Sequence, residues 1–262
     1  MTDSRFTAVI LATDRNPNDP LLVASGACCK AMVNIGGTPM LERVVRDLLD
    51  SAQVDHIVIS GQTHQLAGSA FLQDCFEQGK LQWIAPADSP SSSAHAALRS
   101  LSAGPVLVTT ADHPLLRADI VDAFLQSSRD SKADVTVGLT DYASIHERFP
   151  AARKTVTRFR DGGYCGCNLF TFMTPASHRV AQAWRRVEQQ RKNPLRIISQ
   201  LGWWSVLRYL LGWMTLNSAL GELSRRLDVR IAPVHLPYPE AAIDVDSIAD
   251  QELVEGIAGS DR

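Results

Sequence analysis

Short apolar runs alternate with helical patterns over the first 141 residues, and this alternation is the feature that most constrains the fold. Five runs rich in β-forming residues are typical of strands buried on both faces, namely 6–12, 56–60, 81–85, 105–112 and 133–141. Patterns with helical spacing separate them at 38–52, 90–101 and 117–130. The first helix is expected to start with Thr38 as N-cap and Pro39 at the first helical position. This order predicts β-α-β units with right-handed crossovers and a mostly parallel sheet.

The second half has a different pattern. Residues 153–161 and 164–172 are β-like and are joined by Gly162 and Gly163, which indicates a hairpin. Further helices are expected at 178–190 and 247–257, the latter with Ser247 as N-cap, and further strands at 229–236 and 241–246. No repeat or linker-like composition divides the chain. We therefore expect a single domain over residues 1–262, with a Trp- and Arg-rich helical insertion at about 191–228.

Composition excludes several classes of protein. A net charge of −2 over 262 residues argues against an overall basic, nucleic-acid-coated surface. Five irregularly spaced cysteines are typical of free thiols rather than of a disulfide scaffold. The N-terminus has no secretory pattern, and no run of 18 uncharged apolar residues occurs. These observations predict a cytoplasmic protein.

Polar residues gather where the predicted parallel strands end, which is the edge where such sheets bind ligands. Asp112 closes the run 105–112, and an aspartate there suits a divalent cation or caps the next helix. Asp244 and Asp246 alternate in a predicted strand, so both would point to one side and repel each other unless a cation lies between them or one of them faces solvent. Lys30 ends a long loop after the first strand, where it is either a phosphate ligand or an ordinary surface lysine.

Other candidates are weaker when taken alone. Ser91, Ser92 and Ser93 open a predicted helix, where hydroxyls and backbone N–H groups bind phosphate or simply cap the helix. Asn168 follows Gly166 on a β-like segment, and glycine permits close approach of a ligand. No nucleophile elbow, Walker A lysine, zincin or dinucleotide-binding motif is present.

Three motifs occur in a familiar order: VILATDR followed by Lys30 and GGTPML, then VLVTTADHPLL, then AIDVDSIADQEL. In this order the chain resembles the nucleotidyltransferase superfamily with the glycosyltransferase-A-like fold, which includes the molybdenum cofactor guanylyltransferases. The resemblance implies a Rossmann-like, three-layer α/β/α fold with a mostly parallel mixed sheet and a helical insertion.

The resemblance also implies a reaction and its residues. A Mg²⁺-dependent enzyme would transfer a nucleoside monophosphate from a nucleoside triphosphate to a small phosphorylated acceptor and release pyrophosphate. The implied catalytic residues are Lys30, Arg15 and Asp112. Nucleotide contacts would come from Leu11, Ala12, Thr13, Lys30, Ser92, Ser93 and Asp112. The acceptor would contact Asn168 and Gly166, and Mg²⁺ or Mn²⁺ would bind Asp112, Asp244 and Asp246.

Two features leave alternatives open. The glycine that follows the first strand in the superfamily is replaced by Thr13-Asp14, so a non-catalytic protein that binds nucleotide or a partner through residues 191–228 is the second hypothesis. A glycosyltransferase that uses a nucleotide-sugar is a third. The segment 191–228 contains Trp203, Trp204 and Trp213 among basic residues. It packs on its own domain, forms a homodimer seam, or contacts a membrane or lipid-linked acceptor. Nucleic acid is not an expected partner.

Overall fold

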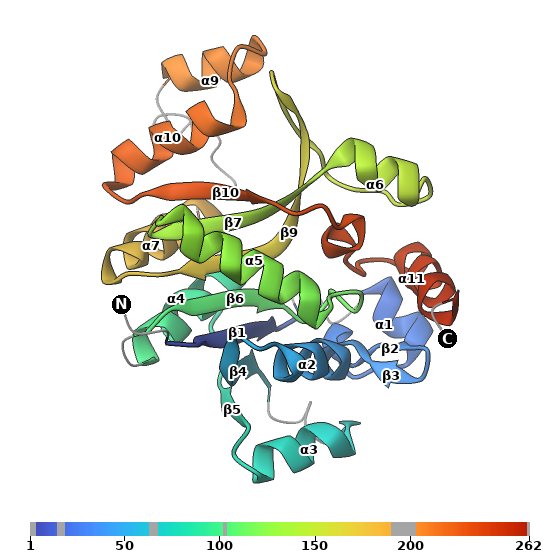
Figure 1. Ribbon diagram of the computed structural model, residues 1–262. Helices are drawn as coiled ribbons and strands as arrows, with labels where there is room; N and C mark the ends of the chain where they lie inside the picture. Colours follow the sequence, from blue (N-terminus) through green and yellow to red (C-terminus); the bar gives the residue numbers. More distant parts are fainter. Residues whose placement is uncertain (1–3, 15–18, 63–67, 102–103, 190–202, 261–262) are drawn as a thin grey trace.

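The computed structural model describes residues 4–14, 19–62, 68–101, 104–189 and 203–260, and its centre is one large mixed sheet (Figure 1). The strand order is β10-β7-β9-β6-β1-β4-β5, and β8 pairs with β9 beside this path. The strands are β1 (Phe6–Ala12), β4 (Val54–Gly61), β5 (Leu81–Ile84), β6 (Val106–Thr110), β7 (Val135–Asp141), β8 (Thr157–Phe159), β9 (Gly162–Phe172) and β10 (Ile231–His235). The strands β5, β4, β1 and β6 pair in parallel, as do β7 and β10, whereas β9 runs antiparallel to β6 and β7.

Strand β1 shows why the apolar runs are continuous. Ala8 and Ile10 lie in the core on one face of the sheet, and Val9 and Leu11 lie in the core on the other. Successive side chains of a strand point to opposite faces, so a strand covered on both faces needs apolar residues throughout.

Helices cover both faces of the sheet and complete the three layers. On one face lie α2 (Met40–Asp50), α5 (Ala118–Ser131) and α11 (Ile248–Ser260), whose buried side chains share the core with Ile10. On the other lie α4 (Pro90–Ser100), α7 (His178–Gln189) and α10 (Leu216–Leu227). The expected three-layer α/β/α architecture with a mostly parallel mixed sheet is therefore confirmed.

Several short elements were not predicted from the sequence. They are α1 (Pro20–Ser25), α3 (Ala70–Glu77), α6 (Tyr142–Arg148), the two-stranded pair β2 (Asn34–Ile35) and β3 (Thr38–Pro39), and 3₁₀ turns at Lys30–Met32, Pro175–Ser177 and Pro239–Ala242. Helices α1, α3 and α6 have six to eight residues, too few for a helical period to stand out.

Three local predictions were wrong. Thr38 and Pro39 form β3, so Pro39 is the N-cap residue of α2 and Thr38 is not. The hairpin of β8 and β9 turns at Arg160 and Asp161, because Phe159 pairs with Gly162 and both glycines belong to β9. Residues 241–246 do not form a strand. Their first two residues end the 3₁₀ turn Pro239–Ala242, and the rest is irregular.

The C-terminal helix begins as predicted. The hydroxyl of Ser247 accepts a hydrogen bond from the Asp250 amide at 3.3 Å and donates one to the Asp250 carboxylate at 2.7 Å. The bond from the Asp250 amide is the one that an N-cap residue makes.

The insertion is described only in part, because residues 190–202 lie outside the described residues. Helix α9 (Trp203–Leu210) stands at the top of Figure 1, and α10 packs beside β10 and α7. Leu210 and Trp213 are 74% and 56% exposed. Among the described residues, no helix is long and apolar enough to cross a membrane. Homodimer, membrane and lipid contacts of this segment, and the single-domain organisation, remain predictions.

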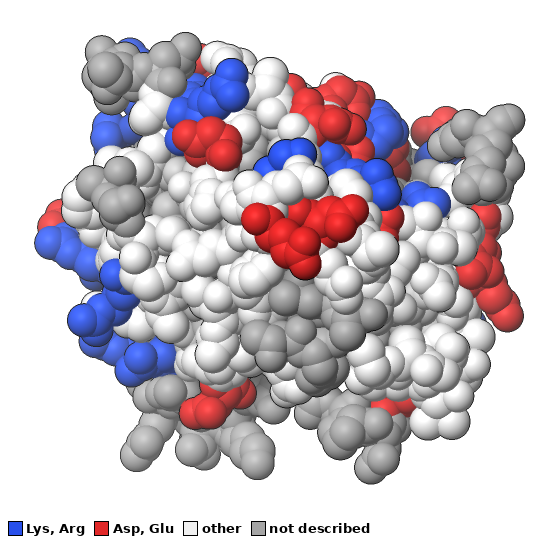
Figure 2. Space-filling view, turned by 90° about the horizontal axis from the view of Figure 1, so that it is seen from below, with Lys and Arg blue, Asp and Glu red and all other residues white. Residues whose placement is uncertain are grey.

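The surface and the cysteines agree with the composition. Figure 2 shows acidic and basic side chains interspersed on the lower face, with neither sign covering it. All five cysteines are free thiols, as expected.

We expect Phe124→Ala to lower the free energy of unfolding by about 3–5 kcal/mol, because it leaves a large cavity. Phe124 is fully buried on α5 and packs against the sheet at Gly138, where a Cβ atom would lie 3.3 Å from its ring. Urea denaturation measures the change. Phe76→Ala is the matched control, since Phe76 is 44% exposed and its loss should cost less than about 1 kcal/mol. Equal losses in the two variants would contradict this account of the core.

Candidate functional site

A pocket of about 350 Å³ opens at the C-terminal ends of β1 and β6, where the parallel sheet was expected to bind a ligand. Seven of the predicted site residues line it: Leu11, Thr13, Lys30, Asp112, Asn168, Asp244 and Asp246. They come from five separate parts of the chain. The tertiary structure thus brings together residues that lie far apart in the sequence.

Two other predicted residues are not part of the pocket lining. Ala12 is buried, Gly166 is exposed on β9, and neither lines the pocket. Arg15 lies outside the described residues. Nucleotide or acceptor contacts by these residues remain predictions.

The serines at the start of α4 form a helix cap. Ser89 is the N-cap, and its hydroxyl accepts a hydrogen bond from the Ser92 amide at 3.3 Å. The Ser93 hydroxyl accepts one from the Ala87 amide at 2.9 Å. The Ser91 amide donates to the Glu188 carboxylate of α7 at 3.1 Å, so this helix N-terminus already contacts an anion. Pro90 lines the pocket, but Ser92 and Ser93 do not.

Lys30 is held between two carboxylates. Its Nζ lies 3.0 Å from Asp19 Oδ2 and 3.1 Å from Asp246 Oδ1. Burial lowers the pKa of Lys30, but the hydrogen bonds to Asp19 and Asp246 outweigh burial and raise it. The ammonium therefore keeps its charge at neutral pH.

Asp14 and Asp19 connect the loop after β1 to Lys30. The Asp14 carboxylate accepts hydrogen bonds from the Lys30 amide at 2.9 and 3.1 Å. Asp19 is the N-cap of α1 and accepts a hydrogen bond from the Leu21 amide at 3.0 Å. Both aspartates line the pocket. The sequence pointed to Asp14 only as a departure from the family glycine, and it did not point to Asp19. Asp19 before Pro20 is a helix-start signal that could have located α1.

Asp112 is fixed by its neighbours. Its carboxylate accepts hydrogen bonds from the Thr110 hydroxyl and from His113 Nδ1, the latter at 2.8 Å. Burial raises the pKa of Asp112, but the bonds from His113 and Thr110 outweigh burial and lower the pKa to about 2. Asp112 is thus an anion under ordinary conditions, and the buried His113 orients it.

The segment that carries Asp244 and Asp246 is attached directly to Asp112. The Val245 amide donates a hydrogen bond to the Asp112 carbonyl at 2.9 Å. Asp246 contacts Lys30, and Asp244 forms an ion pair with Lys154, which precedes β8. No pattern of spacing pointed to Lys154, which sequence reasoning missed.

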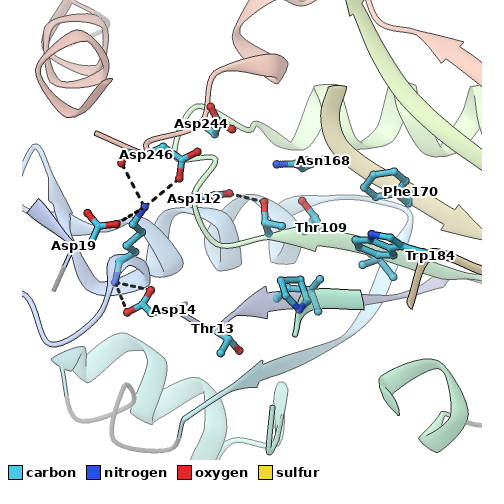
Figure 3. Close-up of a pocket in the computed structure, with 15 residues that line it drawn as sticks. Thr13, Asp14, Asp19, Thr109, Asp112, Asn168, Phe170, Trp184, Asp244 and Asp246 are labelled. Carbon is cyan, nitrogen blue, oxygen red and sulfur yellow. Dashed lines mark hydrogen bonds and ion pairs between the residues drawn. The ribbon is translucent and has the colours of Figure 1, made fainter. Parts of the chain in front are cut away.

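The pocket has a charged end and an aromatic end (Figure 3). The aspartates gather at one end, and Phe170 of β9 and Trp184 of α7 lie together at the other, with ring centroids 5.8 Å apart. Thr109, also on the wall, is fully buried, and its hydroxyl has no hydrogen-bond partner among the described residues. One end thus suits phosphates and cations, and the other suits an apolar or planar group.

A metal held by protein ligands alone is not preformed. No group of three or more His, Cys, Asp or Glu side chains stands ready to hold a metal ion within the described parts of the chain. Asp112, Asp244 and Asp246 nevertheless offer hard carboxylate oxygens to one pocket. Such a donor set suits Mg²⁺ that also binds water and substrate phosphates.

Comparisons with known proteins agree with the fold and the motifs. The family model described as the MobA-like NTP transferase domain matches residues 8–212. A bifunctional protein GlmU from Mycobacterium bovis is 28% identical over 159 residues. That match covers 58% of this chain but only 31% of the relative's length.

Solved structures cover nearly the whole chain. A hypothetical transferase from Thermus thermophilus is 27% identical, with a TM-score of 0.80, and the match covers 94% of this chain and 99% of that one. A CMP:2-keto-3-deoxy-manno-octonic acid synthetase in complex with CTP is 14% identical, with a TM-score of 0.56 over 98% of this chain and 100% of the other. At that identity the likeness shows the fold alone. Together these structures confirm the nucleotide-diphospho-sugar transferase fold.

We expect the free energy of unfolding to fall less steeply with decreasing pH in Asp112→Asn than in the wild type. The folded-state pKa of Asp112 is about 2, below the ordinary value of 3.8, so its contribution to stability is complete above about pH 4. That contribution is lost as the pH falls toward 2. Urea denaturation at several pH values between 7 and 2.5 measures how the free energy of unfolding changes with pH. Asp74→Asn, which removes an exposed aspartate on α3, should follow the wild type, and an unchanged slope in Asp112→Asn would contradict the assignment.

Proposed function

This chain belongs to the MobA-like NTP transferase domain family, which confirms the nucleotidyltransferase class that its motifs predicted, and from that premise we propose a reaction. The protein transfers a nucleoside monophosphate from a nucleoside triphosphate to a small phosphorylated acceptor and releases pyrophosphate. The convergence of Lys30, Asp112, Asp244 and Asp246 on one pocket is the observation that carries this proposal.

The chemistry needs positioned charges and no general base. An oxygen of the acceptor phosphate attacks the α-phosphorus of the triphosphate and forms a new P–O bond. The bond between the α-phosphorus and the bridging oxygen breaks, and its electron pair leaves with pyrophosphate. The acceptor phosphate is already ionised near pH 7, so no proton has to be removed from it. Positioning and electrostatic stabilisation are then the main contributions of the protein.

Lys30 is the residue best placed to bind the triphosphate. Its ammonium reaches the pocket from the loop after β1, and only 22% of the side chain is exposed. Phosphate oxygens would compete with Asp19 and Asp246 for the same Nζ atom, which binds anions as a point charge. The charge retained on Lys30 would offset the charge that develops on the leaving pyrophosphate.

Mg²⁺ or Mn²⁺ fits the carboxylates of this pocket. Asp112 is ionised and fixed, and Asp244 and Asp246 flank the Val245 amide that binds the Asp112 carbonyl. A cation held by these carboxylates and by phosphate oxygens would neutralise the negative charge of the triphosphate. Such a cation would also offset part of the negative charge of Asp14 and Asp19, which line the same pocket.

The replacement of the family glycine by Thr13-Asp14 motivated a non-catalytic alternative. In the structure the Asp14 carboxylate binds the Lys30 amide and so ties the start of the loop to its end. This contact gives Asp14 a local structural role beside the pocket. Binding and turnover of nucleotide separate the catalytic proposal from the non-catalytic one.

We expect one ribonucleoside triphosphate to raise the melting temperature in the presence of Mg²⁺ and to do so less without it. A ligand at a hundred times its Kd adds about 2.7 kcal/mol to the stability of the native state. A thermal-shift panel of ATP, GTP, CTP and UTP, each with and without Mg²⁺, measures this. The absence of a shift with all four nucleotides would argue against nucleotide transfer.

We expect Asp112→Asn to lower the rate of pyrophosphate release by about 100-fold or more, because it removes a fixed negative charge from the reacting centre. The assay pairs the triphosphate that binds with a panel of phosphorylated acceptors. Asp74→Asn is again the control and should retain the wild-type rate. A protein that keeps nucleotide binding but shows no turnover even as wild type would support the non-catalytic alternative.

A further inference from the structure

We propose that Lys154 is a second phosphate-binding lysine of this pocket and that it binds the phosphate of the acceptor, whereas Lys30 binds the donor triphosphate. The inference rests on the proposed function and names the residue that would recognise the second substrate. Neither the sequence motifs nor the comparisons point to Lys154.

The first observation is a line of contacts centred on Asp112. Lys30 binds Asp246, the Val245 amide binds the Asp112 carbonyl, and Lys154 binds Asp244. The two aspartates therefore do not share one partner. Each holds a lysine that comes from a different part of the fold, and Asp112 lies between them in this chain of contacts.

The second observation is the burial of Lys154. Its side chain is only 10% exposed, whereas lysines are almost never this buried unless they are paired. Its partner Asp244 is 25% exposed and lines the pocket. The ammonium is thus one contact away from the pocket. An ion pair of this kind is weak evidence for stability, because desolvation offsets much of the attraction.

The third observation is the side of the pocket from which each lysine comes. Strand β6, which leads to Asp112, lies between β1 and β9. Lys30 follows β1, and Lys154 precedes β8, which pairs with β9. Asn168, on the pocket wall, also belongs to β9. The strands nearest in sequence to the two lysines therefore lie on opposite sides of β6.

The geometry of the reaction makes these two sides distinct. In an in-line displacement, the attacking oxygen and the leaving pyrophosphate lie on opposite sides of the α-phosphorus. With Lys30 on the pyrophosphate side, the acceptor phosphate lies on the β9 side. There the Lys154 ammonium exchanges the Asp244 carboxylate for an oxygen of the acceptor phosphate that does not attack. The lysine donates a hydrogen bond and loses no proton, so the balance of the transfer is unchanged.

Inorganic phosphate is the probe for the test. Isothermal titration calorimetry measures its Kd for full-length protein saturated with Mg²⁺ and with the non-hydrolysable α,β-methylene analogue of the triphosphate that binds. We expect Lys154→Met to weaken phosphate binding by about tenfold or more, with less than about a twofold loss of analogue affinity. Lys30→Met should weaken binding of the analogue instead. Lys154→Arg should restore most of the phosphate affinity, because the charge returns.

Controls separate this role from a structural one. Lys80→Met removes an exposed lysine after α3 and should leave both affinities unchanged. Lys154→Gln is the second variant if Lys154→Met fails to fold, which its melting temperature shows. Unchanged phosphate affinity in the folded Lys154 variants would overturn the inference. So would a wild-type protein that binds the analogue but not phosphate, or an equal loss of analogue binding in the Lys30 and Lys154 variants. A wild-type protein that binds no triphosphate would refute the proposed function itself.

Discussion

The burial of β1 between two layers of helices is the constraint on which the rest of this structure depends. Its side chains alternate between two cores, with Ile10 facing α2 and α5 and Leu11 facing α4. Its backbone pairs in parallel with β4 on one side and β6 on the other. The C-terminal end of a strand held in this way has a fixed position at the edge of the sheet. The loop that carries Thr13 and Lys30 and the turn that carries Asp112 consequently emerge at the same edge of the sheet.

A few polar contacts then convert this edge into a site. The hydrogen bond from Val245 to the Asp112 carbonyl brings the C-terminal segment to the end of β6. Two ion pairs, Lys30 with Asp246 and Lys154 with Asp244, hold that segment from either side. The positions are separated by up to 216 residues in sequence, so the site exists only once the whole sheet has assembled. Under the proposed function, substrate phosphates would compete with the aspartates for both lysines.

Prediction succeeded where the physics is local. Strand β1 and helices α5 and α7 follow from their local sequence patterns, and α4 was recognised from the serines at its start. The strand predicted at 241–246 is not formed. Alternating aspartates in a short apolar run also occur in an irregular segment, and this one is attached by a single backbone hydrogen bond from Val245 to Asp112. Both carboxylates line one pocket, as expected, but an irregular segment places them there rather than the alternation of a strand. Lys154 was missed because its only distinguishing property is its partner, which lies 90 residues away.

The sequence by itself determined the fold class, the family and the positions of Lys30 and Asp112 at one edge of the sheet. These properties depend on hydrophobic period, on the direction of parallel strands and on motifs contained within short stretches. The tertiary structure decided which charges meet. The pairing of Asp19 with Lys30, the carboxylate of Asp14 on the Lys30 amide and the ion pair of Lys154 with Asp244 all depend on where loops from different strands come to rest. An ion pair depends on two groups being a few ångströms apart in space, and such pairs between distant residues produce no periodic pattern in the sequence.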